Sequence, residues 1–185
     1  MTQLAIKNMV CPRCVAAVRS VLAQSGLTAQ QVSIGNATVV QDLTSAQLDA
    51  LNGQLQAQGF ELLRNEDDAL VERIKTATIF LARRDTGEPV KLSEALPQAL
   101  HTDYERLSAL FSAHEGRTIE KFFIAQKVAH VCELLAYGQL TVSEIAWRTG
   151  YSSVAHLSRQ FKQVTGLTPT QYRQSPTQRQ PITEV

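Results

Sequence analysis

The sequence predicts an α+β protein in which a first domain of short strands and helices precedes a second, wholly helical domain. Three observations support this fold class. Hydrophobic and polar residues alternate in short runs near the N-terminus, a Gly-Asn pair separates two of these runs, and beyond residue 67 hydrophobic residues recur three and four positions apart. We therefore expect domains at 1–66 and 67–174, followed by a flexible polar tail at 175–185.

The first domain is expected to contain six elements in the order βαββαβ. Strands are expected at 4–7, 31–34, 38–41 and 60–63, and helices at 14–25 and from about 45 to Gly59. Gly35-Asn36 is the expected two-residue hairpin turn, and Thr44 or Ser45 is the expected cap of the second helix. This order predicts a ferredoxin-like fold, with two helices on one face of a four-stranded antiparallel sheet.

The second domain is expected to hold two helix pairs joined by one long helix. The helices are expected at 70–84, 92–100, 103–113, 119–135, 142–149, 153–165 and 168–173. In the second pair, Ile145 and Ala146 face Leu157 and Phe161, and Gly150 tolerates a left-handed turn between the helices. This is the pattern of a helix-turn-helix unit, which places its second helix in the major groove of DNA.

Charge and composition agree with a globular DNA-binding protein. The chain is 44% hydrophobic and 19% charged, which argues against disorder, and its net charge is only +1. The basic surplus lies at the C-terminal end: from Ala146 onward there are Arg148, Arg159, Lys162, Arg173 and Arg179 against Glu184 alone. A local surplus of this kind is the electrostatic footprint of a nucleic-acid-binding surface.

Other classes of protein are not supported by the sequence. No apolar run approaches 18 residues and the N-terminus has no signal-peptide pattern, so we expect a cytoplasmic protein without a membrane partner. No paired catalytic carboxylates, nucleophile with a base or phosphate-binding glycine loop is visible, so we expect no enzymatic activity. The oligomeric state is left open.

The C-terminal helix pair resembles the AraC/XylS family of transcription regulators. The residues that carry the resemblance are Ile145-Ala146, Gly150-Tyr151, Leu157 to Lys162, Gly166, Thr168-Pro169 and Tyr172-Arg173. The resemblance extends back to about Leu70, with Phe111 and Gly116 closing a first helix-turn-helix unit, and it implies that both units enter adjacent major grooves. The alternative is a helical bundle with an ordinary solvated basic face.

The two units are expected to contribute unequally to DNA recognition. Arg159 suits a bidentate contact to guanine and Lys162 suits a phosphate, whereas Glu105 and Ala109 make the first unit a poor reader. The predicted DNA-contacting residues are Ser153, Val154, His156, Ser158, Arg159 and Lys162 in the second unit, and Arg106, Ser108 and Ser112 in the first. Double-stranded DNA is the expected partner, and RNA polymerase is a candidate second partner.

Two cysteines near the N-terminus form a candidate metal site. Cys11 and Cys14 stand at the start of the first helix with Arg13 between them, and both features lower a thiol pKa. Two thiolates suit a soft ion in near-linear coordination: copper(I) first, then silver or mercury(II). Zinc is less suitable because it takes four ligands, and no His or third Cys occurs in the first 100 residues.

The loop that carries these cysteines resembles the heavy-metal-associated domain of copper chaperones and metal-pumping ATPases. The matching residues are Met9, Cys11, Cys14 and Gly59-Phe60, while Asn8 stands where that family usually has glycine. The resemblance implies metal capture and a candidate metallochaperone partner. Dithiol redox switching, thiols without a function, and a metallochaperone-like protein whose helical half only docks partners stay open. Met9 and Cys132 are expected in the core, and His101, His114 and His130 at the surface or at caps.

Overall fold

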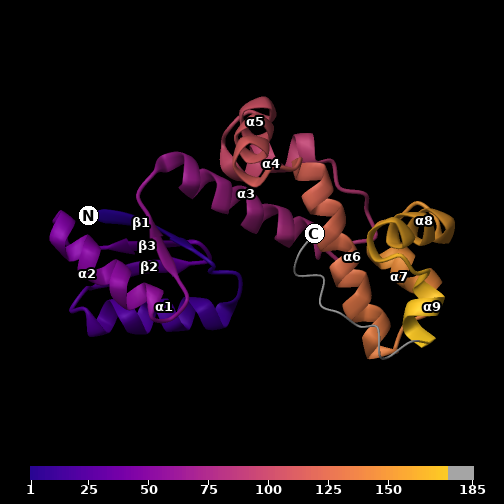
Figure 1. The fold of residues 1–185 in the computed structure, drawn as a ribbon, viewed down its shortest axis with the longest axis horizontal. Coiled ribbons are helices and arrows are strands. Elements are labelled where there is room, and N and C mark those ends of the chain that lie inside the picture. Colours follow the sequence, from indigo (N-terminus) through magenta and orange to yellow (C-terminus); the bar gives the residue numbers. More distant parts are fainter. Residues whose placement is uncertain (175–185) are drawn as a thin grey trace. The chain divides into compact units, whose positions relative to one another are not determined.

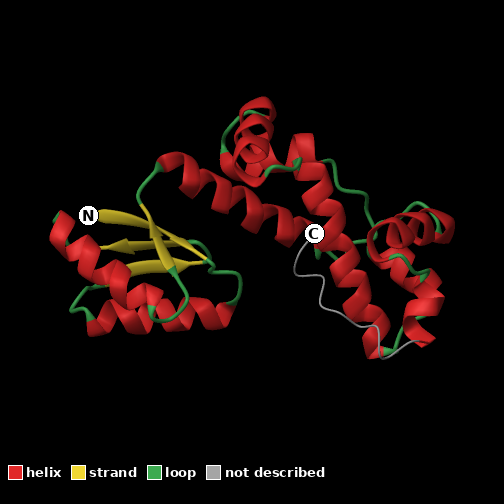
Figure 2. Ribbon diagram, viewed as in Figure 1, coloured by secondary structure: helices red, strands yellow, loops and turns green. Residues whose placement is uncertain are grey.

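The computed structural model describes residues 1–174, and the predicted flexible tail at 175–185 lies outside these described residues. The chain divides into two compact units, Met1–Thr76 and Ala77–Val185 (Figure 1). Strands occur in the first unit, and within residues 77–174 the ordered elements are all helices, so the α+β class with mainly helical content is confirmed (Figure 2). No helix in residues 1–174 combines the length and apolar character needed to cross a bilayer.

The first unit has the predicted element order. Its elements are β1 (Thr2–Lys7), α1 (Pro12–Gln24), β2 (Ala29–Ser33), β3 (Asn36–Val39), α2 (Ser45–Gln56) and β4 (Glu61–Leu63), followed by the start of α3 (Glu66–Ala82). The sheet order is β2-β3-β1-β4 and every neighbouring pair is antiparallel. Thr44 caps α2 with a capping box to Gln47, as the sequence predicts for that helix start.

One hydrophobic core lies between the sheet and its two helices. Leu4 and Ile6 of β1 are buried while their neighbours are not, so one face of the sheet is apolar. Val18 and Leu22 of α1 and Leu55 of α2 are buried in the same cluster. Because both helices contribute to a single core, α1 and α2 share one side of the sheet (Figure 1).

The hairpin turn lies one residue earlier than the sequence predicts. Asn36 pairs with Ser33 of β2 and with Ala5 of β1, so it belongs to β3 rather than to the turn. The turn residues are therefore Ile34 and Gly35, and Gly35 has φ +80°. The expected Gly35-Asn36 turn was wrong because pairing across the sheet decided which residues belong to the strand.

The boundary between the units lies inside a helix. The sequence places the boundary at 66, where α3 begins, whereas the compact units meet at Thr76 and Ala77. The first turns of α3 face the sheet side opposite to α1 and α2: Arg73 lines a polar groove with Gln31 and Thr38, and a Cβ added at Gly35 would lie 3.9 Å from the Thr76 hydroxyl. Packing on the sheet therefore assigns these turns to the first unit.

The second unit follows the predicted helices closely. After α3 come α4 (Leu92–Leu100), α5 (Tyr104–Glu115), α6 (Ile119–Tyr137), α7 (Val142–Arg148), α8 (Val154–Thr165) and α9 (Pro169–Gln174). Side-chain caps start α5, α6, α7 and α8, and left-handed glycines end α5, α6 and α8. Phe111 is fully buried and Gly116 ends α5, as expected for the close of the first helix pair.

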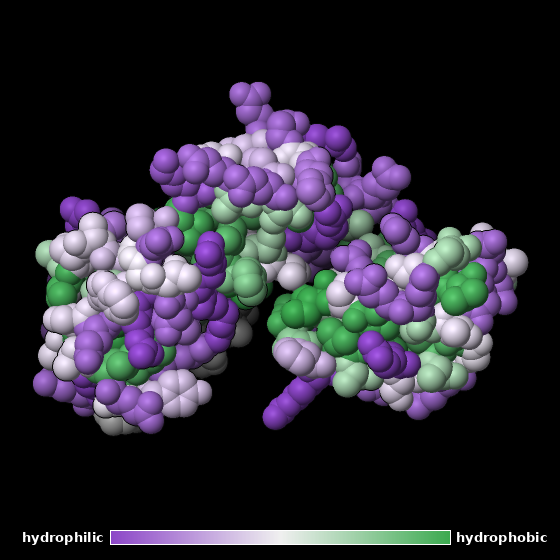
Figure 3. Space-filling model, turned by 180° about the vertical axis from the view of Figure 1, so that it is seen from behind, coloured by the Kyte–Doolittle hydropathy of each residue, from purple (hydrophilic) through white to green (hydrophobic). Residues whose placement is uncertain are grey.

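Hydrophilic residues cover most of the face shown in Figure 3, and hydrophobic residues reach it in separate patches. Among large hydrophobic side chains in the described part of the chain, Tyr137, Phe80 and Trp147 are strongly exposed, at 76%, 71% and 67%. Trp147 is the only tryptophan in the sequence. Its position at the end of α7 makes its fluorescence a reporter for this part of the helical unit.

Candidate nucleic-acid interface and thiol loop

The second helix pair presents one face of α8 to solvent. Leu157 and Phe161 are fully buried against Ile145 and Ala146 of α7, as the sequence predicts. The opposite face carries the predicted DNA-contacting side chains: Ser153, Val154, Arg159 and Lys162 are exposed, and His156 and Ser158 are half-buried. The structure therefore brings all six residues onto one helix and its cap.

The N-terminus of α8 is held by its own side chains. Ser153 is the N-cap, and its hydroxyl accepts a hydrogen bond from the His156 backbone N–H at 3.0 Å. The His156 ring lies 3.1 Å from the Ser152 hydroxyl through Nδ1 and packs edge-on against Tyr151. These contacts orient the imidazole at the end of the helix that a helix-turn-helix unit directs to base edges.

A strap, residues Asp85–Pro89, packs against the turn between α7 and α8. Gly150 in this turn has φ +67°, and a Cβ there would stand 2.5 Å from the Glu88 carbonyl oxygen. The Gly87 N–H donates to the Arg148 carbonyl at 3.1 Å, and the Arg148 guanidinium donates to Asp85 at 3.4 Å. The sequence predicted the left-handed turn but contained no signal for the strap.

The long helix α6 contacts the same turn from another side. Lys127 Nζ lies 4.0 Å from the centre of the Tyr151 ring and makes a long hydrogen bond, 3.5 Å, to the Gly150 carbonyl. Burial lowers the pKa of Lys127 to about 8. The Tyr151 hydroxyl donates to Gln160 of α8 at 2.8 Å, and burial raises the pKa of Tyr151. Nothing in the local sequence indicated Lys127, because its burial depends on tertiary packing.

The first helix pair offers few groups for reading bases. On α5, Glu105, Arg106 and Ala109 are exposed, whereas Ser108 and Ser112 are half-buried. Asp103 caps the helix by accepting a hydrogen bond from the Arg106 backbone N–H. The Arg106 residue is itself exposed to solvent. Contact of this unit with the DNA backbone therefore stays a prediction.

The two N-terminal cysteines form a close thiol pair at the start of α1. Cys11 is the N-cap residue, and its Sγ lies 3.0 Å from Cys14 Sγ. Both are half-buried, and both are free thiols. The hydrogen bond from Cys14, with smaller contributions from backbone N–H groups and Arg13, lowers the pKa of Cys11. No group of three or more His, Cys, Asp or Glu residues within 1–174 is placed to hold a metal ion.

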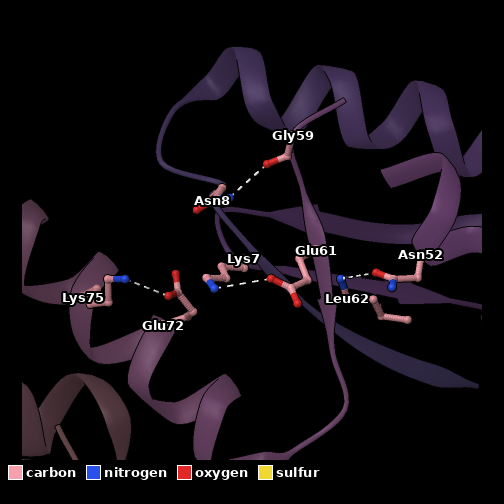
Figure 4. Close-up of polar contacts among 8 residues, drawn as sticks. All are labelled: Lys7, Asn8, Asn52, Gly59, Glu61, Leu62, Glu72 and Lys75. Carbon is pink, nitrogen blue, oxygen red and sulfur yellow. Dashed lines mark hydrogen bonds and ion pairs between the residues drawn. The ribbon is translucent and has the colours of Figure 1, made fainter. Parts of the chain in front are cut away.

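Side-chain contacts of Lys7 and Asn8 hold the loop before the cysteines. Asn8 adopts φ +69°, and its side-chain amide donates to the Gly59 carbonyl at 2.9 Å (Figure 4). Asn has a lower penalty than most residues in this left-handed region. Lys7 pairs with Glu61 at 3.3 Å beside it. Met9 is 2% exposed, so its expected place in the core is confirmed.

The third cysteine and the histidines outside α8 agree with their predicted places, with one exception. Cys132 is buried, as expected, and burial raises its pKa to about 11. His101 ends α4 and His114 is exposed, also as expected. The prediction for His130 was wrong: its side chain is only 14% exposed, its Nδ1 lies 3.8 Å from a Glu133 carboxylate oxygen, and burial lowers its pKa. Its face of α6 packs inside the unit, which the helical periodicity did not indicate.

Comparison with known proteins supports the assignment of the helical unit. Residues 96–175 match the family model described as a helix-turn-helix domain. The MmsAB operon regulatory protein of Pseudomonas aeruginosa is 34% identical over 64 residues, which cover 35% of this chain and 21% of that protein. The transcriptional activator RhaR of an Enterobacter species is 27% identical over 109 residues, covering 59% and 37%. The chain thus spans well under half the length of these relatives.

A solved structure shares the fold of this unit. The C-terminal domain of AraT, a response regulator from Geobacillus stearothermophilus, superposes with a TM-score of 0.51 at 24% identity, covering 57% of this chain and 84% of that one. Together the comparisons show that residues 96–175 resemble a helix-turn-helix domain in sequence and that this unit shares the fold of the AraT C-terminal domain. The MmsAB protein and RhaR are both named as regulators of gene expression.

Proposed function

We propose that this protein is a sequence-specific, cytoplasmic transcription regulator that binds double-stranded DNA through α8. The observation that carries the proposal is the exposed face of α8, where Arg159 and Lys162 have no ion-pair partner within residues 1–174. An exposed guanidinium can make a bidentate contact to guanine, and the ammonium neutralises a phosphate. The MmsAB operon regulatory protein and the transcriptional activator RhaR regulate transcription, and we propose the same kind of role for this chain. RNA polymerase is a proposed contact of the bound regulator.

The test compares Arg159→Ala with Arg106→Ala in gel shifts on the DNA that flanks the coding region. We expect Arg159→Ala to lose about 1–3 kcal/mol of discrimination between target and scrambled DNA. Arg106→Ala removes the same side chain from α5 and should weaken binding to both DNAs equally, because a phosphate contact carries no sequence information. Unchanged discrimination in Arg159→Ala would overturn the assignment of α8 as the reader.

We further propose that the first unit is a ferredoxin-like, heavy-metal-associated type of domain that senses a soft metal ion. The donor set fits such an ion: two half-buried thiols lie 3.0 Å apart, and the pKa of one of them is lowered. Copper(I) is favoured, with silver and mercury(II) as alternatives, because thiolates are soft ligands. Four-coordinate zinc is disfavoured, since Cys11 and Cys14 have no third protein ligand within 1–174.

Metal capture is tested by titrating copper(I), silver, mercury(II) and zinc into the reduced protein in competition with a chelator. Cys11→Ser and Cys14→Ser should each abolish tight copper(I) binding. Cys132→Ser is the matched control, because it also removes one thiol, and we expect it to retain one bound ion per chain. Gel shifts with and without each ion then show whether binding changes DNA affinity, as a regulator requires. Equal affinity with and without every ion would exclude metal sensing.

A redox switch is the second candidate for the same loop. The close approach of the two sulfurs favours it, because a disulfide requires only about 1 Å of further movement. In the reaction, both thiols lose a proton and an electron to an oxidant such as dioxygen, and the S–S bond forms. Mass spectrometry under air distinguishes the candidates: a loss of about 2 Da without metal uptake favours the switch.

A further inference from the structure

Lys127 is a charged residue in a position that lowers the stability of the folded protein. Its side chain is half-buried on α6, and burial is the whole cause of its lowered pKa, with no neighbouring charge contributing. No carboxylate pairs with its ammonium within residues 1–174. Removing a charge from water without an opposite charge is unfavourable, so the amine weakens the fold whenever it is protonated.

The contacts of this amine lie at the base of the recognition helix. The ammonium stands over the face of Tyr151, at 4.0 Å from the ring centre, and against the Gly150 carbonyl. Tyr151 in turn contacts α8 twice: its hydroxyl donates to Gln160, and its ring packs edge-on against His156. A cation is attracted both to the face of an aromatic ring and to a carbonyl oxygen, so the Lys127 ammonium holds Tyr151 and the Gly150 carbonyl in place.

We propose that Lys127 is a positioning residue that clamps the turn between α7 and α8 and so fixes the approach of α8 to DNA. The proposal rests on the DNA-reading role proposed for α8. The ammonium acts through Tyr151 and Gly150, since both lie between it and the recognition helix. The strap approaches the same turn at the Gly150 Cα, through the Glu88 backbone, whereas Lys127 contacts the Gly150 carbonyl oxygen and the Tyr151 ring.

The groups that face the amine determine how it responds to pH. From the turn these are the Gly150 carbonyl and the neutral Tyr151 ring, and from α6 itself the Phe123 ring, 5.8 Å away. Beyond Tyr151 lies His156 of α8. Deprotonation removes the attraction to the ring, so the clamp weakens as pH rises through about 8. Over the same range the unfavourable burial of charge also disappears. DNA affinity should therefore fall while the stability of the unit rises.

The experiment uses the full-length chain with Lys127→Met, Lys127→Arg and a control, Lys121→Met, which removes an exposed lysine from the same helix. DNA affinity is measured between pH 7 and pH 9 on the flanking DNA. Acrylamide quenching of Trp147 is measured without DNA, because the Gly150 N–H donates to the Trp147 carbonyl and the indole lies against Gly87 of the strap that packs on this turn.

At pH 7 we expect Lys127→Met to bind DNA about tenfold more weakly than Lys121→Met, with a changed Trp147 quenching constant. Lys127→Arg stays protonated and should keep its affinity constant across the pH range. Equal affinities of the two Met variants would overturn the proposal. So would weaker binding with unchanged Trp147 quenching, which indicates a direct DNA contact, or a pH-dependent loss that persists in Lys127→Arg. Because the quenching is measured without DNA, a failure of α8 as the reader, detected with Arg159→Ala, is distinguishable from a failure of the clamp.

Discussion

The contact between the strap and the second helix pair yields a quantitative prediction for Gly150→Ala. Gly150 has φ +67°, which costs a residue with a Cβ about 1–2 kcal/mol. The added Cβ would also stand 2.5 Å from the Glu88 carbonyl oxygen and 2.9 Å from its carbon, both backbone atoms that cannot rotate away. Overpacking of this kind costs about 1–3 kcal/mol. Together the two terms predict that Gly150→Ala lowers the free energy of unfolding by about 2–5 kcal/mol.

Gly166→Ala is the matched control, since Gly166 has φ +77° and no atom within 4 Å of the added Cβ. Its free energy of unfolding should fall only by the cost of a residue with a Cβ at positive φ, about 1–2 kcal/mol. The assay is urea unfolding followed by Trp147 fluorescence, which reports the helical unit. The difference between the two variants measures the contact with the strap. If both variants lost the same stability, the close approach of Glu88 to the turn would be refuted.

Three further predictions concern single side chains. His101→Gly should stabilise the helical unit by up to about 1 kcal/mol, measured by urea unfolding, because His101 ends α4 at φ +53°. The stability of the unit should rise between about pH 8 and pH 9, because the unfolded chain still binds the Lys127 proton that the folded chain has lost; at higher pH the raised pKa values of Cys132, Tyr104 and Tyr151 act in the opposite direction. Cys11, with its lowered pKa, should react with iodoacetamide at pH 7 before buried Cys132, measured by peptide mass spectrometry.

A specific result would contradict each of these predictions. Destabilisation by His101→Gly would mean that the imidazole makes a stabilising contact at the helix end. The rise in stability with pH should be absent in Lys127→Met, and its persistence there would assign it to another group. Reaction of Cys132 at the same rate as Cys11 would contradict the burial of Cys132. Unfolding in urea before alkylation should make the cysteines equally reactive.

The elements were predictable where their signals are local. The helices of the second unit follow from a three-to-four residue periodicity and from caps such as Thr141 with Glu144, all within one stretch of chain. The hairpin turn was displaced by one residue because Asn36 pairs with strands on both sides, and one of these partners is 31 positions away at Ala5. The residue types in the turn do not reveal the pairing of Asn36 with Ala5.

The candidate sites divide in the same way. The exposed face of α8 and the pair Cys11 and Cys14 could be named from residue types and spacing, and the structure places each set together. Periodicity did not reveal that the His130 side chain is largely buried or that Lys127 is half-buried over Tyr151. Both residues lie on α6, whose sequence is apolar on more than one face, so its exposed side could not be read from the pattern.

By itself the sequence determined the order of the elements, the α+β class and the residue types offered to DNA and to a soft ion. These depend on propensity, caps and hydrophobic periodicity, which act over a few residues. Only the tertiary structure decided that α3 begins on the sheet of the first unit, that Asp85–Pro89 packs on the Gly150 turn, and that Lys127 lies half-buried there. These features depend on close packing between segments distant in sequence, and the free energy of a buried charge or of a close backbone contact is set by its neighbours in space.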